Sequence, residues 1–213
     1  MRRNSVLLLV AAIAVLGACT DDGAGVATSP STSAQQTEGA QAGQETTGAE
    51  GTEVSMTNAE GASVGTVTLT PEGNSVRVRA ELEGLQPGFH GFHIHDVGLC
   101  EPGAPDGPFT TAKGHYVGEG GGHGDHDGDM PSLYVRDDGT ASMTVTLDTF
   151  TVEELTAGDG AAVMVHAGSD NFANIPNRYT AAGGAAPGPD QMTTSTGDAG
   201  ARAACGVVDP AQA

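Results

Sequence analysis

The sequence predicts an all-β protein, a sandwich or barrel of about eight short strands, and three observations support this. Only 38% of the 213 residues are hydrophobic and 4% aromatic, and 33 Gly with no Trp suit a loop-rich β domain better than a helical core. Short runs of alternating apolar and polar residues recur between Gly- and Pro-rich turns from Thr52 onward. No stretch has a convincing helical period, and residues 150–155 could form one helical turn at most.

The strand from residue 75 to 83 is the clearest example of this alternation. Val76, Val78, Ala80 and Leu82 share one face, and charged residues occupy the other. Seven more strands are expected to begin at Thr52, to follow Gly88, and to cover residues 62–70, 131–136, 140–147, 161–166 and 203–208. Residues 101–129 and 167–201 are expected to be long loops.

The N-terminus is typical of a targeting segment. A basic start, Met1–Asn4, precedes an apolar run of about a dozen residues, which is too short for a transmembrane helix and right for a signal peptide. The run ends in Leu16-Gly17-Ala18-Cys19, which resembles a bacterial lipobox. We therefore expect cleavage of residues 1–18 and lipidation of Cys19; the alternative is an ordinary signal peptide with an incidental cysteine.

Residues 19–51 are rich in Ala, Gly, Thr, Ser, Gln and Glu and have no apolar periodicity. Such a segment cannot bury enough apolar surface to offset the entropy of ordering it, so we expect a disordered tether. The expected organisation is a lipid-anchored tether followed by one domain at 52–213, held outside the cytoplasm at the cell membrane. Lipidation of Cys19 would leave two of the three cysteines, Cys100 and Cys205, for a pair.

The chain is strongly acidic. Eight basic and 27 acidic residues give a formal charge of −19, which would become −21 on removal of Arg2 and Arg3 with the signal peptide. This argues against nucleic acid as a partner, because a phosphate backbone requires a basic face. It also disfavours long-range attraction of an anionic substrate, so any such attraction must be local.

Two histidines stand at alternate positions in Phe92-His93-Ile94-His95. On a strand they would point to the same face about 7 Å apart, which makes half of a metal site, while Phe92 and Ile94 would pack on the other face. Incidental surface histidines are the alternative. All seven histidines lie between positions 90 and 166, which favours the metal site.

A second concentration of metal-ligating side chains lies between Gly114 and Asp129. Three histidines and an aspartate in a Gly-rich loop could form a tetrahedral zinc site. His166 ends an apolar strand and could face His93 and His95, and imidazole-rich sites suit Cu(II). The alternative is a flexible acidic loop with adventitious metal affinity, and spacing alone does not assign each histidine to a metal.

Two long motifs resemble the bacterial copper/zinc superoxide dismutases, in a lipoprotein form. They are the run from Gly91 to Gly98 and the run from Gly197 to Val207, and the resemblance covers roughly residues 52–208. It implies a Greek-key β-sandwich or barrel with long metal-binding and substrate-guiding loops. It also implies disproportionation of superoxide to O₂ and H₂O₂ by a cycling Cu(II)/Cu(I) centre beside a zinc site, with one copper and one zinc per chain.

The resemblance also implies roles for individual residues. The copper ligands would be His93, His95, His115 and His166, and the zinc ligands His115, His123, His126 and Asp129. His115 would bridge both metals and carry a proton. Arg202 would guide the anion beside the copper, with Lys113 as a second candidate cation. Asp170 would link copper and zinc ligands, Cys100 would pair with Cys205, and His90 would be structural.

The sequence departs from the family pattern at the zinc loop. Only Gly124 and Asp125 separate His123 from His126, so we expect zinc to be bound weakly, with His123 the ligand most in question. A non-catalytic copper- or zinc-binding lipoprotein on the same scaffold is the competing hypothesis. A purely structural surface domain ranks last, because it leaves the clustered histidines unexplained. A homodimer is left open.

Overall fold

A computed structural model describes residues 51–184 and 186–209 of the chain. The expected signal peptide, Cys19 and most of the expected tether lie outside the described residues. In the described part, no helix is both long and apolar enough to cross a membrane.

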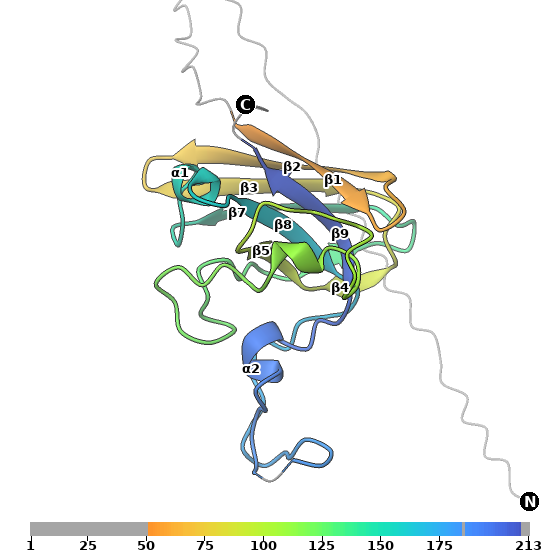
Figure 1. Ribbon diagram of the computed structural model, residues 1–213, viewed down its shortest axis with the longest axis vertical. Coiled ribbons are helices and arrows are strands. Elements are labelled where there is room, and N and C mark those ends of the chain that lie inside the picture. The colour runs from red at the N-terminus through yellow and green to blue at the C-terminus, as the bar shows by residue number, and fades with distance from the viewer. Residues whose placement is uncertain (1–50, 185, 210–213) are drawn as a thin grey trace, which may run out of the picture. The chain divides into compact units, whose positions relative to one another are not determined.

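The described residues form nine strands, two short α-helices and one 3₁₀ turn, so the predicted all-β class is confirmed (Figure 1). Their bounds are β1 Thr52–Asn58, β2 Ser63–Glu72, β3 Ser75–Leu82, β4 Gly88–His90, β5 Phe92–His95, η1 Thr110–Ala112, β6 Leu133–Val135, β7 Ala141–Leu147, α1 Val152–Thr156, β8 Ala161–His166, α2 Thr193–Thr196 and β9 Arg202–Val208. The ninth strand arises because the expected strand after Gly88 is interrupted at Gly91.

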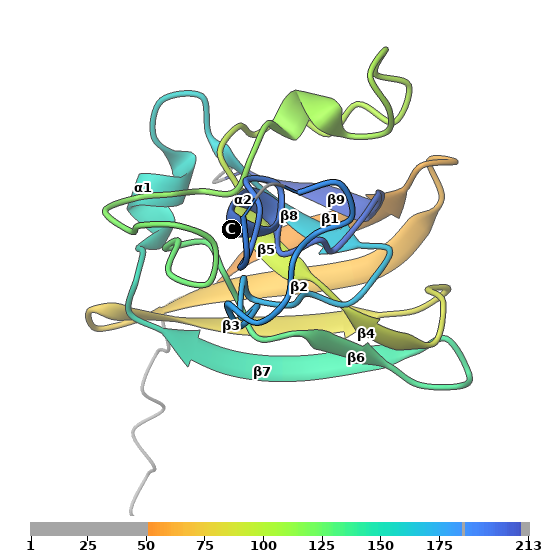
Figure 2. The same cartoon turned by 90° about the horizontal axis from the view of Figure 1, so that it is seen from below.

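All nine strands pair antiparallel in one sheet, in the order β4-β6-β7-β3-β2-β1-β9-β8-β5. The sheet curls into a nearly closed barrel whose two edge strands, β4 and β5, are joined by Gly91 alone (Figures 1 and 2). Gly91 donates to Gly168 O at 2.8 Å and accepts from His166 N at 2.8 Å. A Cβ on Gly91 would lie 2.7 Å from Ala199 Cβ, so glycine is required where the strand changes neighbours.

The barrel interior is filled by alternate residues of the strands. Val54, Leu69, Val78, Phe92 and Val163 are fully buried and belong to one cluster. The exposed faces of β1, β3 and β7 carry polar residues, as the alternation predicts.

Strand β8 is buried on both faces. Its outward residues Ala162 and Met164 pack with Phe109, Ala112 and Cys205 in a second apolar cluster beneath the loop that follows β5. The long loops after β5 and β8 gather at one side of the barrel, where the expected metal ligands lie (Figures 1 and 2).

Candidate metal centre

Strand β5 supplies the first two histidines of the site. Phe92 and Ile94 are fully buried in the barrel core, so the alternation of the strand turns His93 and His95 to its outer face. Their ring centroids lie 6.4 Å apart. Both rings are nonetheless buried, with 0% and 1% of the residue exposed, because the loops cover them.

The two edges of β5 bring the remaining ligands alongside. On one edge β5 pairs with β8, which ends at His166. On the other edge, Tyr116 N donates to Ile94 O at 2.8 Å and Ile94 N donates to Gly128 O at 2.9 Å. This short ladder sets His115 opposite His95 and Asp129 opposite His93.

Four imidazoles form the first candidate metal group: His93, His95, His115 and His166. One nitrogen of each β-strand histidine is occupied by an acceptor: His93 Nε2 lies 2.6 Å from Asp170 Oδ2, His95 Nδ1 3.0 Å from Lys113 O, and His166 Nδ1 3.1 Å from Gly200 O. These contacts hold a proton on the named nitrogen. They leave His93 Nδ1, His95 Nε2 and His166 Nε2 as lone-pair donors to a metal.

The remaining ring nitrogens of these histidines lie close together, and hydrogen bonds between them do not satisfy their lone pairs. His95 Nε2 and His166 Nε2 lie 3.3 Å apart, and with both protons on Nδ1 two lone pairs face each other. His93 Nδ1 and His115 Nε2 are buried without a hydrogen-bond partner. A cation at this point satisfies all four nitrogens, and four imidazoles suit Cu(II).

The second group contains a carboxylate. His115 Nδ1 lies 2.9 Å from Asp129 Oδ1, and His123 Nδ1 lies 3.1 Å from His115 Nδ1 and 3.2 Å from Asp129 Oδ1. Tetrahedral bonds of about 2.0–2.1 Å place neighbouring ligand atoms about 3.3 Å apart. The donor atoms therefore already have the spacing of a zinc site, and His115 contributes its second nitrogen to it.

His126 completes this second group better than His93. Four atoms from His93, His115, His123 and Asp129 also lie mutually close, but His93 Nε2 is committed to Asp170. His126 Nδ1 is buried without a hydrogen-bond partner and lies 3.4 Å from Asp129 Oδ2. Its free nitrogen makes it the fourth candidate ligand.

The short spacing between His123 and His126 does not displace His123. The side chain of His123 is fully buried, and its Nε2 lies 2.7 Å from Asp170 Oδ1. The backbone N–H of His123 donates to Thr194 O at 2.9 Å. The loop after β8 thus holds the ring from the far side. This geometry removes the reason for expecting weak zinc binding, although the affinity itself stays a prediction.

Asp170 connects the two groups. Its side chain is fully buried, and its two oxygens accept separately from His93 Nε2 and His123 Nε2. Phe172 N also donates to Oδ1, at 2.6 Å. Asp170 therefore occupies the linking position that the sequence resemblance implies.

Burial and these contacts separate the pKa values of the site. Burial lowers the pKa of His93 to about 4 and that of His166 to about 3, and it holds the pKa of His95 well below its ordinary value. Burial alone would lower the pKa of His123, but its hydrogen bonds to Asp129 and Asp170 raise it to about 9. The β-strand imidazoles are thus neutral at pH 7 and ready to ligate a metal.

A β-bulge brings Arg202 to the site. Val165 pairs with Ala204, but His166 pairs with Arg202, so the register of β8 against β9 skips one residue. The bulge sets Arg202 beside His166 at the end of β8. Partial burial lowers the pKa of Arg202, and a guanidinium still remains protonated.

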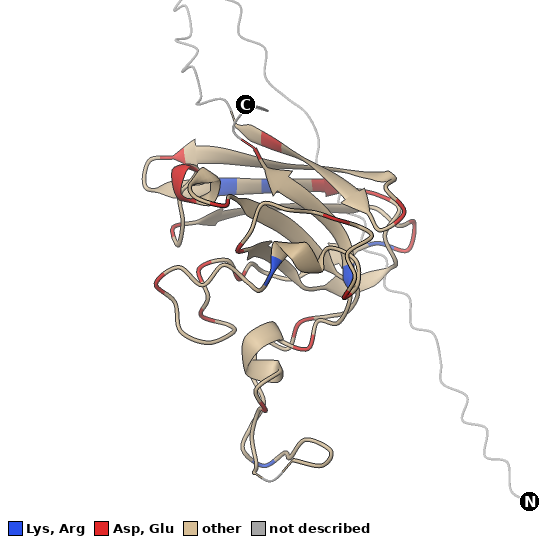
Figure 3. Ribbon diagram, viewed as in Figure 1, with Lys and Arg blue, Asp and Glu red and all other residues tan. Residues whose placement is uncertain are grey.

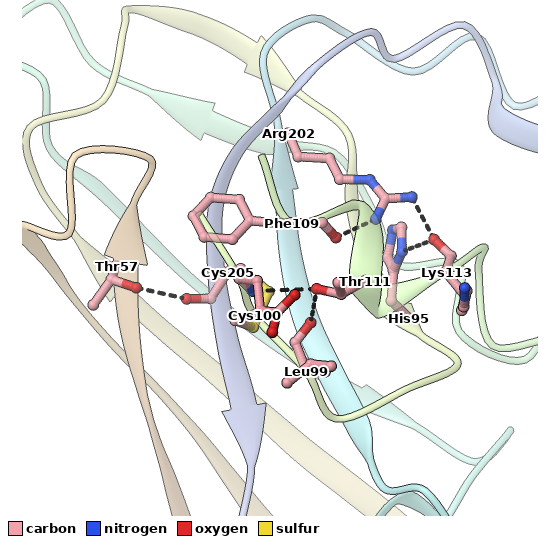
Figure 4. Close-up of a disulfide and its surroundings, with 10 residues drawn as sticks. Thr57, His95, Leu99, Cys100, Phe109, Thr111, Lys113, Arg202 and Cys205 are labelled. Carbon is pink, nitrogen blue, oxygen red and sulfur yellow. Dashed lines mark hydrogen bonds between the residues drawn. A yellow bond between two sulfur atoms is a disulfide. The ribbon is translucent and has the colours of Figure 1, made fainter. Parts of the chain in front are cut away.

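Backbone carbonyls hold the guanidinium in place. Arg202 donates to Phe109 O through Nη1 and to Lys113 O through Nη2 (Figure 4). Phe109 and Lys113 flank η1 and have positive φ values of 60° and 64°, which are strained for residues other than glycine. Lys113 O also accepts from His95 Nδ1, so one carbonyl positions both a candidate ligand and the arginine.

A disulfide joins Cys100 to Cys205 across 105 residues, as the resemblance implies. It ties the beginning of the loop that carries Phe109 and Lys113 to β9, three residues after Arg202 (Figure 4). Thr111 Oγ1 reinforces the loop by donating to Leu99 O at 3.0 Å and accepting from Glu101 N at 3.2 Å. The disulfide thus anchors the carbonyls that orient Arg202.

A cavity of about 370 Å³ leads to the first group. Its lining includes His95, His115, His166 and Arg202 on one hand and, in and around α2, Met192, Ser195, Thr196 and Asp198 on the other. Acidic positions outnumber basic ones over the described residues (Figure 3). Arg202 is therefore a local positive charge in an acidic protein.

The structure brings the predicted ligands of the two metal groups close to Asp170 and Arg202, with His126 next to Asp129 but outside the sets of mutually close ligand atoms. Two features were missed: the carbonyls of Phe109 and Lys113, and the side chain of Asp198. Lys113 stays a predicted second cation, and in addition its backbone carbonyl contacts His95 and Arg202. His90 lies outside the metal groups, with its ring nitrogens 2.7 Å from His166 O and 2.8 Å from Gln86 O, as its structural role implies.

The fold and the site define an antiparallel β-barrel metalloprotein with two adjoining histidine-rich metal groups and one histidine common to both. A sequence model of the copper/zinc superoxide dismutases matches residues 63–208. The chain belongs to that family, so the resemblance to the copper/zinc superoxide dismutases is confirmed, whereas the lipoprotein form stays a prediction.

Named relatives agree. The chain is 49% identical over 151 residues to a copper-zinc superoxide dismutase of Mycolicibacterium paratuberculosis, covering 67% of this chain and 62% of that one. It is 52% identical over 132 residues to that of Mycobacterium tuberculosis, covering 58% and 54%. The chain therefore spans little more than half the length of these relatives. For that of Photobacterium leiognathi the identity is 36% over 166 residues, covering 73% and 84%.

Solved structures resemble the barrel. The copper/zinc superoxide dismutase of Brucella abortus aligns with a TM-score of 0.55 and 32% identity, over 75% of this chain and 100% of that one. A doubly mutated superoxide dismutase-like protein of Bacillus subtilis aligns with a TM-score of 0.56 and 27% identity, over 75% and 98%.

Proposed function

We propose that this protein disproportionates superoxide to O₂ and H₂O₂, with copper at the four-histidine group and zinc at the group that contains Asp129. The observation that carries this proposal is the cavity, which Arg202 lines together with His95, His115 and His166. A cation beside a candidate copper site suits a small anion as substrate.

The donor sets fit the two metals. Four imidazoles suit copper. His115, His123 and Asp129 have the spacing of a zinc site, and His126 next to Asp129 supplies a third imidazole for it. When bound, copper would supply the one-electron couple that oxidises one superoxide ion and reduces the next, and zinc would stay redox-inert.

Arg202 is the anion-binding residue in this proposal. Two of its N–H groups are committed to Phe109 O and Lys113 O, which orients the guanidinium and leaves its other N–H groups for the substrate. The positive charge of Arg202 attracts an anion only at short range. It is needed there because the net negative charge of the chain repels anions.

His115 is the residue that would hold the proton. Its Nδ1 lies 2.9 Å from Asp129 Oδ1, its Nε2 is buried without a hydrogen-bond partner, and the residue lines the cavity. Nε2 is thus the ring atom that can take a proton whenever it does not ligate copper, and return that proton to the reduced oxygen species. The competing storage hypothesis is not favoured, because a protein that only stores copper has no use for the orientation of Arg202.

The test is the rate of superoxide consumption by the full-length protein, measured by fast kinetics after loading with copper and zinc and after loading with zinc alone. We expect fast turnover only in the copper-loaded protein. Copper bound at one per chain without turnover would overturn the proposal and favour metal storage.

We also propose that Cys19 carries a lipid and anchors the protein outside the cytoplasm. The lipobox-like run before Cys19 and the disulfide between Cys100 and Cys205 support this, since disulfides persist in oxidising compartments. Labelling of expressing cells with a fatty-acid analogue tests it, with Cys19→Ser as the control. Equal labelling of the parent and Cys19→Ser would contradict the proposal.

Whether the protein forms a homodimer is a separate question, which sedimentation of the purified protein tests.

A further inference from the structure

Asp198 places a negative charge in the wall of the cavity. Among the residues that line the cavity, Arg202 carries the positive charge and Asp198 the negative one. A carboxylate there repels an anionic substrate, so its contacts need an explanation.

Both hydrogen bonds to the Asp198 carboxylate converge on one oxygen. Oδ2 accepts from Thr193 Oγ1 at 2.6 Å and from Asn171 Nδ2 at 2.8 Å. Thr193 begins α2 and is only 6% exposed, whereas Asn171 directly follows Asp170. Asp198 therefore joins the cavity wall to the segment whose carboxylate holds His93 and His123.

Backbone contacts show how closely these segments approach each other. Asn171 N donates to Gly197 O at 2.9 Å, and Gly168 N donates to Ala199 O at 2.9 Å. A Cβ on Gly197 would lie 1.9 Å from Asp170 Oδ1 and 2.2 Å from His123 Nε2. The chain at Gly197 thus lies directly on the contact between Asp170 and His123, and Asp198 is the next residue.

The wall is joined to the second metal group at another point as well. His123 N donates to Thr194 O in α2, at 2.9 Å. A shift of α2 away from Asp198 would therefore move the backbone of His123 relative to Asp170, whose segment is bonded to Gly197 and Asp198.

We propose that Asp198 is a positioning residue: through Asn171 and Thr193 it fixes Asp170 and His123 for the second metal, and it does so at a cost in the rate of anion capture. The cost in rate rests on the proposed function. The positioning does not, because it concerns only metal retention.

Two substitutions separate the charge from the contacts. Asp198 has φ of 53°, a conformation that Asn and Gly tolerate well, so neither change adds backbone strain as alanine would. Asp198→Asn keeps an acceptor oxygen for Thr193 and Asn171 but removes the charge. Asp198→Gly removes both. Asp190→Asn is the control for loss of one charge outside the cavity lining, because asparagine keeps the oxygen that accepts from Thr193 N at 3.0 Å.

The first measurement is the rate at which zinc passes from the loaded full-length protein to a chelating dye, together with the visible spectrum after cobalt(II) replaces zinc. We expect Asp198→Gly to release zinc about tenfold faster and to alter the cobalt spectrum. Asp198→Asn and Asp190→Asn should stay within about twofold of the parent. Equal release from the parent and Asp198→Gly would overturn the positioning role, as would Asn behaving like Gly.

The second measurement is superoxide consumption at low ionic strength. We expect Asp198→Asn to be about twofold faster and Asp190→Asn to be unchanged, because one charge near the route of a small anion has an effect of that size. An unchanged rate in Asp198→Asn would refute the cost in rate. Absence of turnover in every loaded form, with the zinc result as expected, would reject the proposed function and leave the positioning role standing.

Asn171→Ala gives an independent check should Asp198→Gly fail to fold. It removes the donor to Asp198, together with the acceptor for Ala173 N, and leaves the charge of Asp198 in place. Zinc release should therefore accelerate as in Asp198→Gly while superoxide consumption does not rise. Normal zinc retention in Asn171→Ala would contradict the proposal.

Discussion

Replacing Asp170 with Asn should weaken zinc binding more than copper binding. The carboxylate gives one oxygen to His93 Nε2 at 2.6 Å and the other to His123 Nε2 at 2.7 Å, with Phe172 N also on the second oxygen. An amide has one acceptor oxygen and an NH₂ group. With its oxygen toward the two donors at His123 and Phe172, its NH₂ group faces the N–H of His93.

The size of the effect follows from which side can move. His93 lies in β5, which is paired on both edges, whereas His123 and the 170–172 segment lie in loops. Because the NH₂ group of the asparagine repels the N–H of His93, we expect the 170–172 segment to move away from His93. This movement also takes the side-chain oxygen of residue 170 away from His123 Nε2. Loss of such a supporting contact costs about 10- to 100-fold in metal affinity, or about 1.4–2.7 kcal/mol.

Competition titrations with chelating dyes, one for each metal, measure the change. Asp127→Asn is the matched control, because Asp127 lies in the same loop as His123. Within the described residues, the hydrogen bond of its carboxylate is the one that Oδ2 accepts from the backbone N–H of Glu119. Unchanged zinc affinity in Asp170→Asn would refute the reasoning, and so would a larger loss for copper than for zinc.

Three further predictions concern the whole site. Arg202→Ala should slow superoxide consumption by about tenfold or more at unchanged copper content, with the exposed Arg136→Ala as control; equal rates would remove Arg202 from the mechanism. Cys100→Ala should lower the free energy of unfolding in urea by about 2–5 kcal/mol, because the disulfide closes a loop spanning 105 residues; an unchanged midpoint would contradict this. In metal-free protein, the lowered pKa values of His93 (about 4) and His166 (about 3) mean that the unfolded chain binds more protons below pH 6.5, so stability falls as the pH drops. The raised pKa of His123 (about 9) means that the folded chain holds more protons above pH 6.5, so stability also falls as the pH rises toward 9. Urea unfolding should therefore show a maximum near pH 6.5, and a monotonic profile from pH 4 to 9 would disprove this assignment.

The sequence alone predicted the all-β class and the face on which His93 and His95 lie. Both depend on strand alternation, which is a local property of the backbone, and Phe92 and Ile94 marked the opposite face by their hydrophobicity. The remaining ligands were predicted from the resemblance of two motifs to the family, because spacing alone did not assign them. The ninth strand was missed because the strand is interrupted at Gly91, where Ala199, distant in sequence, leaves no room for a Cβ.

Only the tertiary structure showed which ring nitrogens are free to ligate a metal and how Arg202 is held. The tautomers depend on acceptors distant in sequence, such as Asp170 for His93 and Gly200 for His166. Arg202 reaches the site through a bulge that pairs it with His166, and no residue type in β9 announces that bulge. Such features arise from contacts between segments far apart in the chain, so the local sequence pattern does not contain them.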